Sequence, residues 1–345
     1  MGKFIYINEN VHPISFRYTH HASPSGYDIL CKYMGPAIQS KPIPAWLIPN
    51  RVIWRLAQGV ILYDRHALAL ETKAILHSLT HSKQIYHFIY GENSYKYLGY
   101  FTNLRNNHVV ASFHQPPELL EKFFQSDVHL QKLSAIIVLG NSQLSYFRDK
   151  VDSSKIFFVP YGVDTDFFKP FSKKPPVSGT CLCVGNWLRD FQLLREVIRQ
   201  VHQRNSKVKF IIITNPENFT YLTDLPVEIH SGISDQRLLE LYQSSTLLLL
   251  PLKELVASTS LLEALSCGLP VILNDIGSAR DYVNEKQAIL TPPGDASAMS
   301  DAIIYLIENP DLREEMSKSC RKQALNFSWP RIIERLDKVY TKIMC

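Results

Sequence analysis

The sequence has no hydrophobic run long enough to cross a membrane. A membrane-spanning helix needs roughly 18 or more apolar residues in a row, and no run here approaches that length. The apolar run near the start, residues 4–8, is shorter than the apolar region of about 7–15 residues in a secretory signal peptide. We therefore expect a cytoplasmic protein whose first apolar run is a buried strand.

Paired cysteines are also lacking. The six cysteines are scattered along the chain, and none forms a C-x-x-C pair: Cys31, Cys181, Cys183, Cys267, Cys320 and Cys345. Zinc and redox sites use ligands that are paired at short, fixed spacing. The scatter therefore predicts buried, reduced thiols and no metal site.

The net charge of +5 is modest but unevenly placed. Residues 1–162 carry 16 Lys and Arg against 10 Asp and Glu, whereas the remainder carries 21 against 22. A basic half is typical of contact with an anionic partner or membrane surface, and ordinary variation accounts for it equally well. The sequence contains no nucleic-acid-binding motif, so nucleic acid is not an expected partner.

Short apolar runs alternate with longer stretches of helical periodicity along the whole chain. The expected strands are residues 4–8, 85–90, 108–113, 135–140, 155–162, 180–186, 209–214, 227–232, 246–252, 270–275 and 288–292. Between them lie expected helices at 141–149, 191–204, 235–244, 259–267 and 296–308. Continuous apolar strands in a βαβα order predict parallel sheets covered by helices on both faces.

A break in this pattern divides the chain. Residues 165–178 hold three prolines and three lysines without a clear period, which predicts a linker. It would join an N-terminal domain, residues 1–164, to a C-terminal domain, residues 179–328. The amphipathic residues 329–345 are expected to form a helix that packs back toward the N-terminal domain. The predicted fold is α/β, with two Rossmann-like, doubly wound domains facing a central cleft where a ligand binds.

Residues 257–275 (ASTSLLEALSCGLPVILND) carry the strongest functional signal. Ser258, Thr259 and Ser260 open an expected helix directly after a strand, and the N–H groups at such a helix start bind phosphate. Glu263 follows about one turn later, where a carboxylate suits two neighbouring hydroxyls such as those of a ribose. Simple helix capping explains a serine-rich start as well.

The same stretch resembles the nucleotide-sugar signature of the two-domain GT-B glycosyltransferases, especially glycosyltransferase family 4. The signature E-A-x-x-x-G-x-P-V reads here from Glu263 to Val271. Further family-like segments follow in the proper order, at residues 141–147, 159–170, 231–242, 278–303 and 327–336. The resemblance covers the chain from about residue 107 to its end. It implies a GT-B fold and a retaining glycosyltransferase. Such an enzyme moves a sugar from a nucleotide diphosphate donor to a hydroxyl acceptor, which is a glycan, a glycolipid or a small molecule.

The resemblance also implies which residues bind the donor: Gly26, Gly185, Asn186, Arg189, Gly232, Ile233, Ser258, Thr259, Ser260, Leu261 and Glu263. Arg189 is expected against the diphosphate, and a plain surface charge is the alternative. The family usually pairs two glutamates eight positions apart, the first of which contacts the transferred sugar. Here that position is Leu255, so either Glu254 reaches in or main-chain groups of residues 257–260 take its place.

On the acceptor side, His114 ends an expected strand just before a Pro-Pro turn. It resembles the family's histidine beside the transferred sugar, and Gly26 lies where the family has its glycine-rich first loop. The resemblance implies catalytic roles for His114, Arg189 and Glu263, with no general base and no obligatory cofactor or metal ion. A nucleotide-sugar epimerase of the same fold, or a non-catalytic scaffold that binds nucleotide sugar or glycan, is the alternative.

Residues 43–60 interleave Trp46 and Trp54 with Arg51 and Arg55. Such a stretch fits a lipid-linked acceptor or an anionic membrane, which would place the protein peripherally at the inner membrane face. The alternative is a helix buried beneath the loops that hold the acceptor.

Overall fold

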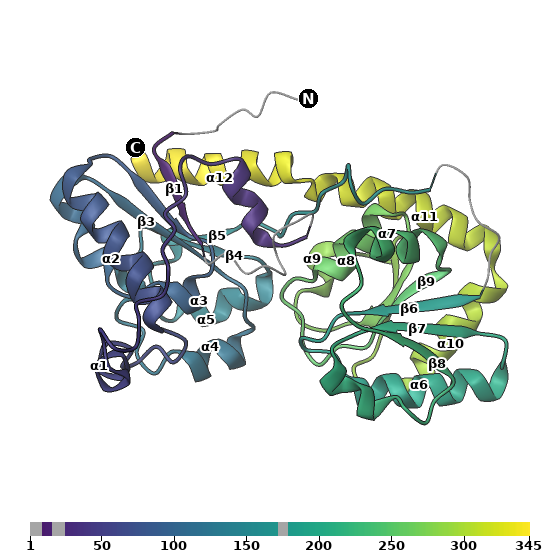
Figure 1. Ribbon diagram of the computed structural model, residues 1–345. Helices are drawn as coiled ribbons and strands as arrows, with labels where there is room; N and C mark the ends of the chain where they lie inside the picture. The colour runs from purple at the N-terminus through teal and green to yellow at the C-terminus, as the bar shows by residue number, and fades with distance from the viewer. Residues whose placement is uncertain (1–8, 16–24, 172–178) are drawn as a thin grey trace. The chain divides into compact units, whose positions relative to one another are not determined.

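The computed structural model describes residues 9–15, 25–171 and 179–345, which form two compact units. Unit 1 comprises Met1–Tyr161 and Trp329–Cys345, and unit 2 comprises Gly162–Ser328. Each unit holds one parallel β-sheet with helices packed on it (Figure 1). The predicted fold class, α/β with a parallel sheet in each of two domains, is confirmed.

The described strands of unit 1 form a parallel sheet in chain order, β1-β2-β3-β4-β5. They are β1 (Val11–Ile14), β2 (Ile85–Phe88), β3 (His108–Phe113), β4 (Ala135–Val138) and β5 (Ile156–Phe158). The α-helices of this unit are α1 (Asn50–Leu56), α2 (Arg65–Thr80), α3 (Gly91–Ser94), α4 (Pro117–Phe123), α5 (Leu144–Arg148) and α12 (Trp329–Met344). A 3-10 helix, η2 (Tyr27–Lys32), precedes α1.

Successive residues of β2 show how both faces of this sheet are covered. The Tyr86 hydroxyl lies 2.9 Å from Nδ1 of His77 on α2. Nδ1 of the next residue, His87, lies 2.6 Å from the Tyr340 hydroxyl on α12. Because neighbouring strand residues point to opposite faces, α2 covers one face and the C-terminal helix covers the other.

The described strands of unit 2 form a six-stranded parallel sheet in the order β11-β10-β9-β6-β7-β8. They are β6 (Thr180–Val184), β7 (Lys209–Ile213), β8 (Val227–His230), β9 (Leu247–Leu250), β10 (Val271–Asn274) and β11 (Ala288–Thr291). The α-helices of this unit are α6 (Phe191–Arg204), α7 (Asp235–Ser244), α8 (Thr259–Ser266), α9 (Ala279–Tyr282), α10 (Ala296–Glu308) and α11 (Pro310–Ala324). Helices α6 and α10 pack together on one face, and α8 packs with α11 on the other (Figure 1).

All expected strands from residue 85 onward overlap observed strands, and the bounds of α6, α7 and α10 were predicted to the residue. The strand expected at residues 4–8 lies outside the described residues. Among the elements that were not predicted are β1 and the long helices α2 and α11. The strand order reverses in unit 2, as in a doubly wound sheet, whereas the described strands of unit 1 follow one another without a reversal.

The expected linker at residues 165–178 begins with residues that are anchored in unit 2. Arg321 donates hydrogen bonds of 3.0 Å to the carbonyl oxygens of Phe168 and Thr165, and the Phe168 side chain is fully buried. Residues 172–178 lie outside the described residues. The cleft expected between the domains stays a prediction.

Two expectations drawn from absences can be compared with the described residues. No helix among residues 9–15, 25–171 and 179–345 is long and apolar enough to cross a membrane. All six cysteines are free thiols, and four of them are buried. The expectation of burial is wrong for Cys31, which is half-buried, and for Cys345, which is exposed.

Candidate functional site

Unit 2 has a crevice-forming topology at the carboxyl ends of β6 and β9. These two strands are neighbours, but the chain leaves β6 toward β7 and leaves β9 toward β10, so the loops after them diverge. Ligands of open α/β sheets bind at such a switch point. The two loops are tied together at their bases, because Asp190 N–H donates to Pro251 O at 2.9 Å and Lys253 N–H to Leu188 O at 2.9 Å.

The loop after β6 depends on a glycine. Gly185 has φ +109°, and a Cβ atom added there would lie 2.8 Å from Nη2 of Arg189. A larger residue would therefore meet both backbone strain and a clash. The next residue, Asn186, fixes the loop to the end of β7, since its Oδ1 accepts hydrogen bonds from Asn215 N–H (2.6 Å) and Thr214 Oγ1 (2.9 Å). Asp190 caps α6, because its side chain accepts hydrogen bonds from the N–H groups of Gln192 and Leu193.

Arg189 turns inward beneath this loop. Its guanidinium donates to Val184 O through Nε (3.0 Å) and Nη2 (2.8 Å), to Trp187 O (3.3 Å) and to Ser260 Oγ (2.7 Å). The side chain is buried, and this burial lowers the pKa of the guanidinium. Arg189 is thus a buried cation that joins β6 to the start of α8, and the alternative of a plain surface charge is wrong.

The start of α8 gathers the small hydroxyl residues. Ser258 is the N-cap and accepts a hydrogen bond from Leu261 N–H, and its Oγ lies 3.0 Å from Ser260 Oγ. Both serines are buried, whereas Thr259 between them is half-buried. In an α-helix the first N–H groups, here those of Thr259 and Ser260, have no intrahelical acceptor. The helix start therefore combines N–H groups, the positive end of the helix dipole and the Arg189 charge.

Glu263 lies one turn further into α8 and is buried, with an exposed fraction of 4%. Its Oε2 accepts a hydrogen bond of 2.9 Å from the Tyr242 hydroxyl on α7. Burial together with this carboxylate raises the pKa of Tyr242, so the hydroxyl remains a donor. Tyr242 was not predicted from the sequence, because a tyrosine on an amphipathic helix reads as a core residue.

The loop between β9 and α8 contains the position where the family's first glutamate is expected. Leu255 occupies that position, and its side chain is 2% exposed. Oε1 of Glu254 accepts a hydrogen bond from Leu255 N–H at 2.9 Å. A Cβ atom on Gly277 would overlap Leu255 O and Glu254 Oε1. Glycine at this position allows the loops after β9 and β10 to pack together.

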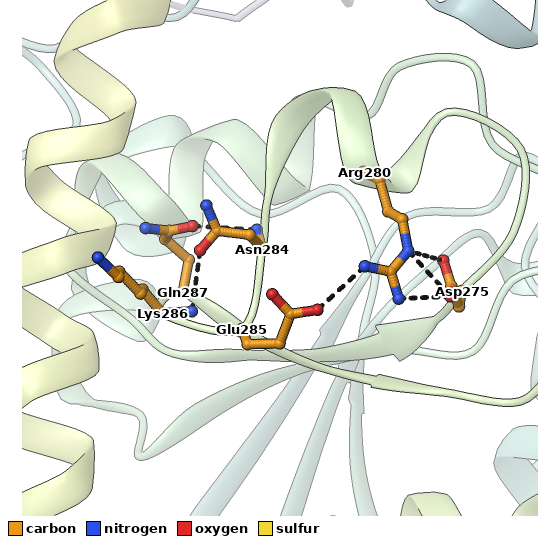
Figure 2. A network of polar contacts seen from close by, with 6 residues as sticks. All are labelled: Asp275, Arg280, Asn284, Glu285, Lys286 and Gln287. Carbon is orange, nitrogen blue, oxygen red and sulfur yellow. Dashed lines mark hydrogen bonds and ion pairs between the residues drawn. The ribbon is translucent and has the colours of Figure 1, made fainter.

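A polar network holds the loop after β10 in place (Figure 2). Arg280 on α9 donates to both carboxylate oxygens of Asp275 (2.8 to 3.1 Å) and to Oε1 of Glu285 at 3.0 Å. At the end of β10, the buried Asn274 accepts a hydrogen bond from Leu252 N–H at 2.6 Å. These contacts fix the carboxyl edge of the sheet beside the switch point.

The structure therefore brings together one subset of the predicted donor residues. Gly185, Arg189, Ser258 and Ser260 contact one another directly or through Arg189, and Glu263 follows on the same helix. Gly232 and Ile233 follow β8, which is separated from β6 by β7. Their part in donor binding stays a prediction.

In unit 1, His114 lies at the carboxyl end of β3 and is half-buried. Its Nε2 lies 2.8 Å from Ile89 O, and because a carbonyl only accepts, this nitrogen carries a proton. The rings of Tyr27 and Tyr90 pack around it at centroid distances of 4.7 and 4.6 Å. Gly26, with φ 105°, directly precedes Tyr27 as the N-cap of η2, so the two predicted residues of this unit are near neighbours.

Glu92 on α3 is a buried acid that the sequence did not reveal. It is 1% exposed, its Oε1 accepts a hydrogen bond from His114 N–H at 3.2 Å, and its Oε2 has no hydrogen-bond partner among the described residues. Burial raises the pKa of this carboxyl to about 7. The hydrogen bonds that it accepts act in the opposite direction but are weaker than the effect of burial. A lone glutamate after a strand carries no motif, so only the fold identifies it.

The geometry of unit 2 agrees with a comparison to known families. Residues 178–309 match the family model described as "Glycosyl transferases group 1". They form a group 1 glycosyl transferase domain. This group 1 domain contains every site residue predicted in unit 2, and the resemblance to glycosyltransferases is confirmed.

Relatives and solved structures extend this comparison beyond the group 1 domain. The chain is 28% identical over 134 residues to D-inositol 3-phosphate glycosyltransferase from Saccharomonospora viridis. That match covers 36% of this chain and 31% of the relative, so the chain spans about a third of that relative's length. Sucrose-phosphate synthase from Thermosynechococcus elongatus has the same fold, with a TM-score of 0.72 and 15% identity over 97% of this chain and 99% of that one. The Anabaena protein HepE, in complex with UDP and glucose, gives a TM-score of 0.67 and 12% identity over 97% and 99%.

Proposed function

We propose that this protein transfers a sugar from a nucleotide diphosphate donor to a hydroxyl acceptor, with retention of the anomeric configuration. The observation that carries the proposal is the meeting of two loops at the switch point of unit 2. There a glycine loop, a buried arginine and a serine-rich helix start converge within the group 1 domain. The bound UDP and glucose of HepE, which shares the fold, support a nucleotide sugar as the ligand.

In this proposal the donor diphosphate binds at the start of α8. The N–H groups of Thr259 and Ser260 and the helix dipole face its negative charge. Arg189 adds positive charge next to the helix start, because its Nη2 donates a hydrogen bond of 2.7 Å to Ser260 Oγ. Charge that develops on the leaving diphosphate is stabilised by groups already held in place, so little reorganisation is needed.

Glu263 is proposed to bind the ribose hydroxyls of the donor. Tyr242 holds its Oε2 through a hydrogen bond of 2.9 Å, which fixes the carboxylate on the buried face of α8. Gly185 and Asn186 would border the diphosphate, and Gly232, Ile233 and Leu261 the nucleotide. Glu254 is the remaining acid in the loop that precedes the helix start.

His114 in unit 1 is proposed to face the transferred sugar, with Gly26 beside it. Its Nε2 donates a hydrogen bond to Ile89 O, which fixes the orientation of the ring, and Glu92 accepts a hydrogen bond from the main-chain N–H of the same residue. The acceptor hydroxyl would attack on the face from which the diphosphate leaves and pass its proton to that phosphate. The proposal needs no separate general base, no obligatory cofactor and no metal ion.

The first experiment measures thermal unfolding of the purified protein with a panel of UDP-, GDP- and ADP-sugars. A donor that binds only the folded protein raises the melting temperature as its concentration increases. We expect one donor to stabilise the protein, Glu263→Ala to lose this response, and donor plus acceptor to give a glycosylated product. Glu315→Ala, which changes an exposed glutamate on α11, should keep the full response.

Because Glu263 is buried, its alanine variant can fail to fold. Glu263→Gln keeps an acceptor for Tyr242 but removes the charge, so it separates folding from binding. If no nucleotide sugar stabilises folded protein, the transfer proposal is wrong. If a donor binds but no acceptor ever yields product, a non-catalytic scaffold replaces it.

A further inference from the structure

Residues 43–61 of unit 1 expose an unusual amount of apolar surface. Trp46 is 82% exposed and Trp54 78%, and Leu47, Val52 and Ile61 are exposed as well. Within α1 only Ile53 is buried. The alternative of a helix buried beneath other loops is therefore wrong. Gathered apolar side chains, unlike isolated ones, mark an interaction site.

A pocket of about 350 Å³ adjoins the end of α1. Its wall includes Tyr97, whose hydroxyl donates to Leu56 O at 2.6 Å, and Lys96, whose Nζ donates to Gln58 O at 2.6 Å. Tyr100, Phe101 and Val128 also line it and are exposed. Residues 43–61 and this pocket are named here the docking surface. It holds eight of the 17 exposed large apolar side chains found among the described residues.

The charge of the docking surface has one dominant sign. Residues 43–61 contain Arg51 and Arg55 and no acidic residue, and both arginines are exposed, as is Lys41 just before this segment. Arg51 and Arg55 are four positions apart, so they lie on one side of α1. Around the pocket, Lys96 and Lys132 lie over the rings of Tyr97 and Tyr100, at 5.1 and 5.4 Å.

One acidic residue, Asp127, lies between the pocket residues Ser126 and Val128. Its Oδ2 lies 3.7 Å from Nζ of Lys150, which offsets its charge. Exposed tryptophans beside arginines match the boundary between lipid headgroups and acyl chains, where the indole ring is partly solvated and the cation meets phosphate. A purely apolar partner would leave the charges of Arg51 and Arg55 without an anionic counterpart.

We propose that the docking surface binds an anionic lipid bilayer. Helix α1 would lie in the plane of the membrane interface, with Trp46 and Trp54 at headgroup depth and Arg51 and Arg55 against anionic headgroups. The pocket would take up apolar groups of the lipid. This inference is independent of the proposed sugar transfer, because it uses none of the residues assigned to donor or acceptor.

The test is flotation of the full chain with vesicles of two compositions. One contains phosphatidylcholine alone and the other equal parts of phosphatidylcholine and phosphatidylglycerol. We expect binding to the anionic vesicles, weakened by salt, and little binding to the neutral ones. Replacing each arginine, in Arg51→Gln and Arg55→Gln, should lower partitioning about five-fold. Trp46→Ala with Trp54→Ala should lower it further, because apolar contact is lost.

Matched controls are Leu76→Ala on α2, whose side chain is 61% exposed, and Arg148→Gln on α5, which is also exposed. Both lie in unit 1 outside the docking surface, so they should bind vesicles like the original protein. The inference is overturned if anionic vesicles do not bind, if neutral vesicles bind equally well, or if the controls lose as much as the test variants. It is also overturned if Trp46 and Trp54 instead mediate a dimer that does not float with vesicles of either composition. Nucleotide-sugar stabilisation, measured on the same variants, reports separately on the donor site.

Discussion

Glu92 offers a prediction whose sign and size follow from burial. Burial raises the pKa of its carboxyl from 4.5 to about 7 in the folded protein. Between these two pH values the unfolded chain has lost the proton that the folded chain still holds, so the free energy of unfolding falls as pH rises. A shift from 4.5 to about 7 corresponds to roughly 3 kcal/mol across that window.

The perturbation is Glu92→Gln, which keeps the shape and the acceptor for His114 N–H but cannot ionise. Below pH 4.5 the variant and the original protein should have similar stability, and above pH 7 the variant should be more stable by about 3 kcal/mol. The assay is urea unfolding of unit 1, followed by the fluorescence of the buried Trp329. The other three tryptophans are replaced by phenylalanine in both proteins.

Other titrating groups act equally on both proteins, so they cancel in the difference. Glu118→Gln, a change of the same kind at an exposed position on α4, is the matched control and should show no comparable swing. A difference between Glu92→Gln and the original protein that stays constant from pH 4.5 to pH 7 refutes the reasoning. In that case the carboxylate is hydrated or paired at neutral pH.

Three further predictions concern both units. Ser260→Ala removes the acceptor of the Arg189 hydrogen bond at 2.7 Å, and should lower the free energy of unfolding of unit 2 by about 1.5–3 kcal/mol in urea titrations. Gly185→Ala places a Cβ atom 2.8 Å from Nη2 of Arg189 at a positive φ, and should cost about 1–3 kcal/mol and weaken nucleotide-sugar binding in thermal shifts. Burial lowers the pKa of His87 from 6.5 to about 3, so the folded form stays neutral while the unfolded form gains a proton, and stability should be lost as pH falls below 6.5. His87→Gln should lose less stability over the same range, and an equal loss would contradict the assignment.

The sequence predicted elements best where local rules and burial agree. The helical period of residues 191–204 matched α6, whose start is capped by Asp190. The continuous apolar strands of unit 2 were found because both faces of that sheet are covered. β1 escaped prediction because it is short and contains Pro13, which reads as a strand breaker. β1 is stabilised by its pairing with β2, and the local sequence pattern does not reveal such a pairing.

The sequence indicated which segments of unit 2 carry the candidate site but not how their side chains contact one another. The start of α8 and Glu263 follow from residue types and spacing, whereas the inward turn of Arg189 depends on the backbone of Gly185 and on acceptors from β6 and α8. Glu92 depends even more on tertiary structure, because it is buried where α3 packs against α2 and β3. Properties that arise from segments distant in sequence cannot be read from either segment alone.

Unit 1 is built from two segments that are far apart in the sequence, and this has a consequence for folding during synthesis. Its last layer, α12, supplies the Tyr340 hydroxyl to the buried His87 and the Trp329 ring beside Tyr27. The ribosome completes all of unit 2 before this helix emerges, so unit 2 can fold first although it comes second. Until then, one face of the β1–β5 sheet lacks its cover and exposes apolar surface. Unit 1 therefore cannot complete its fold until α12 has been synthesised. Chaperone binding during translation should be strongest between the synthesis of β5 and the synthesis of α12.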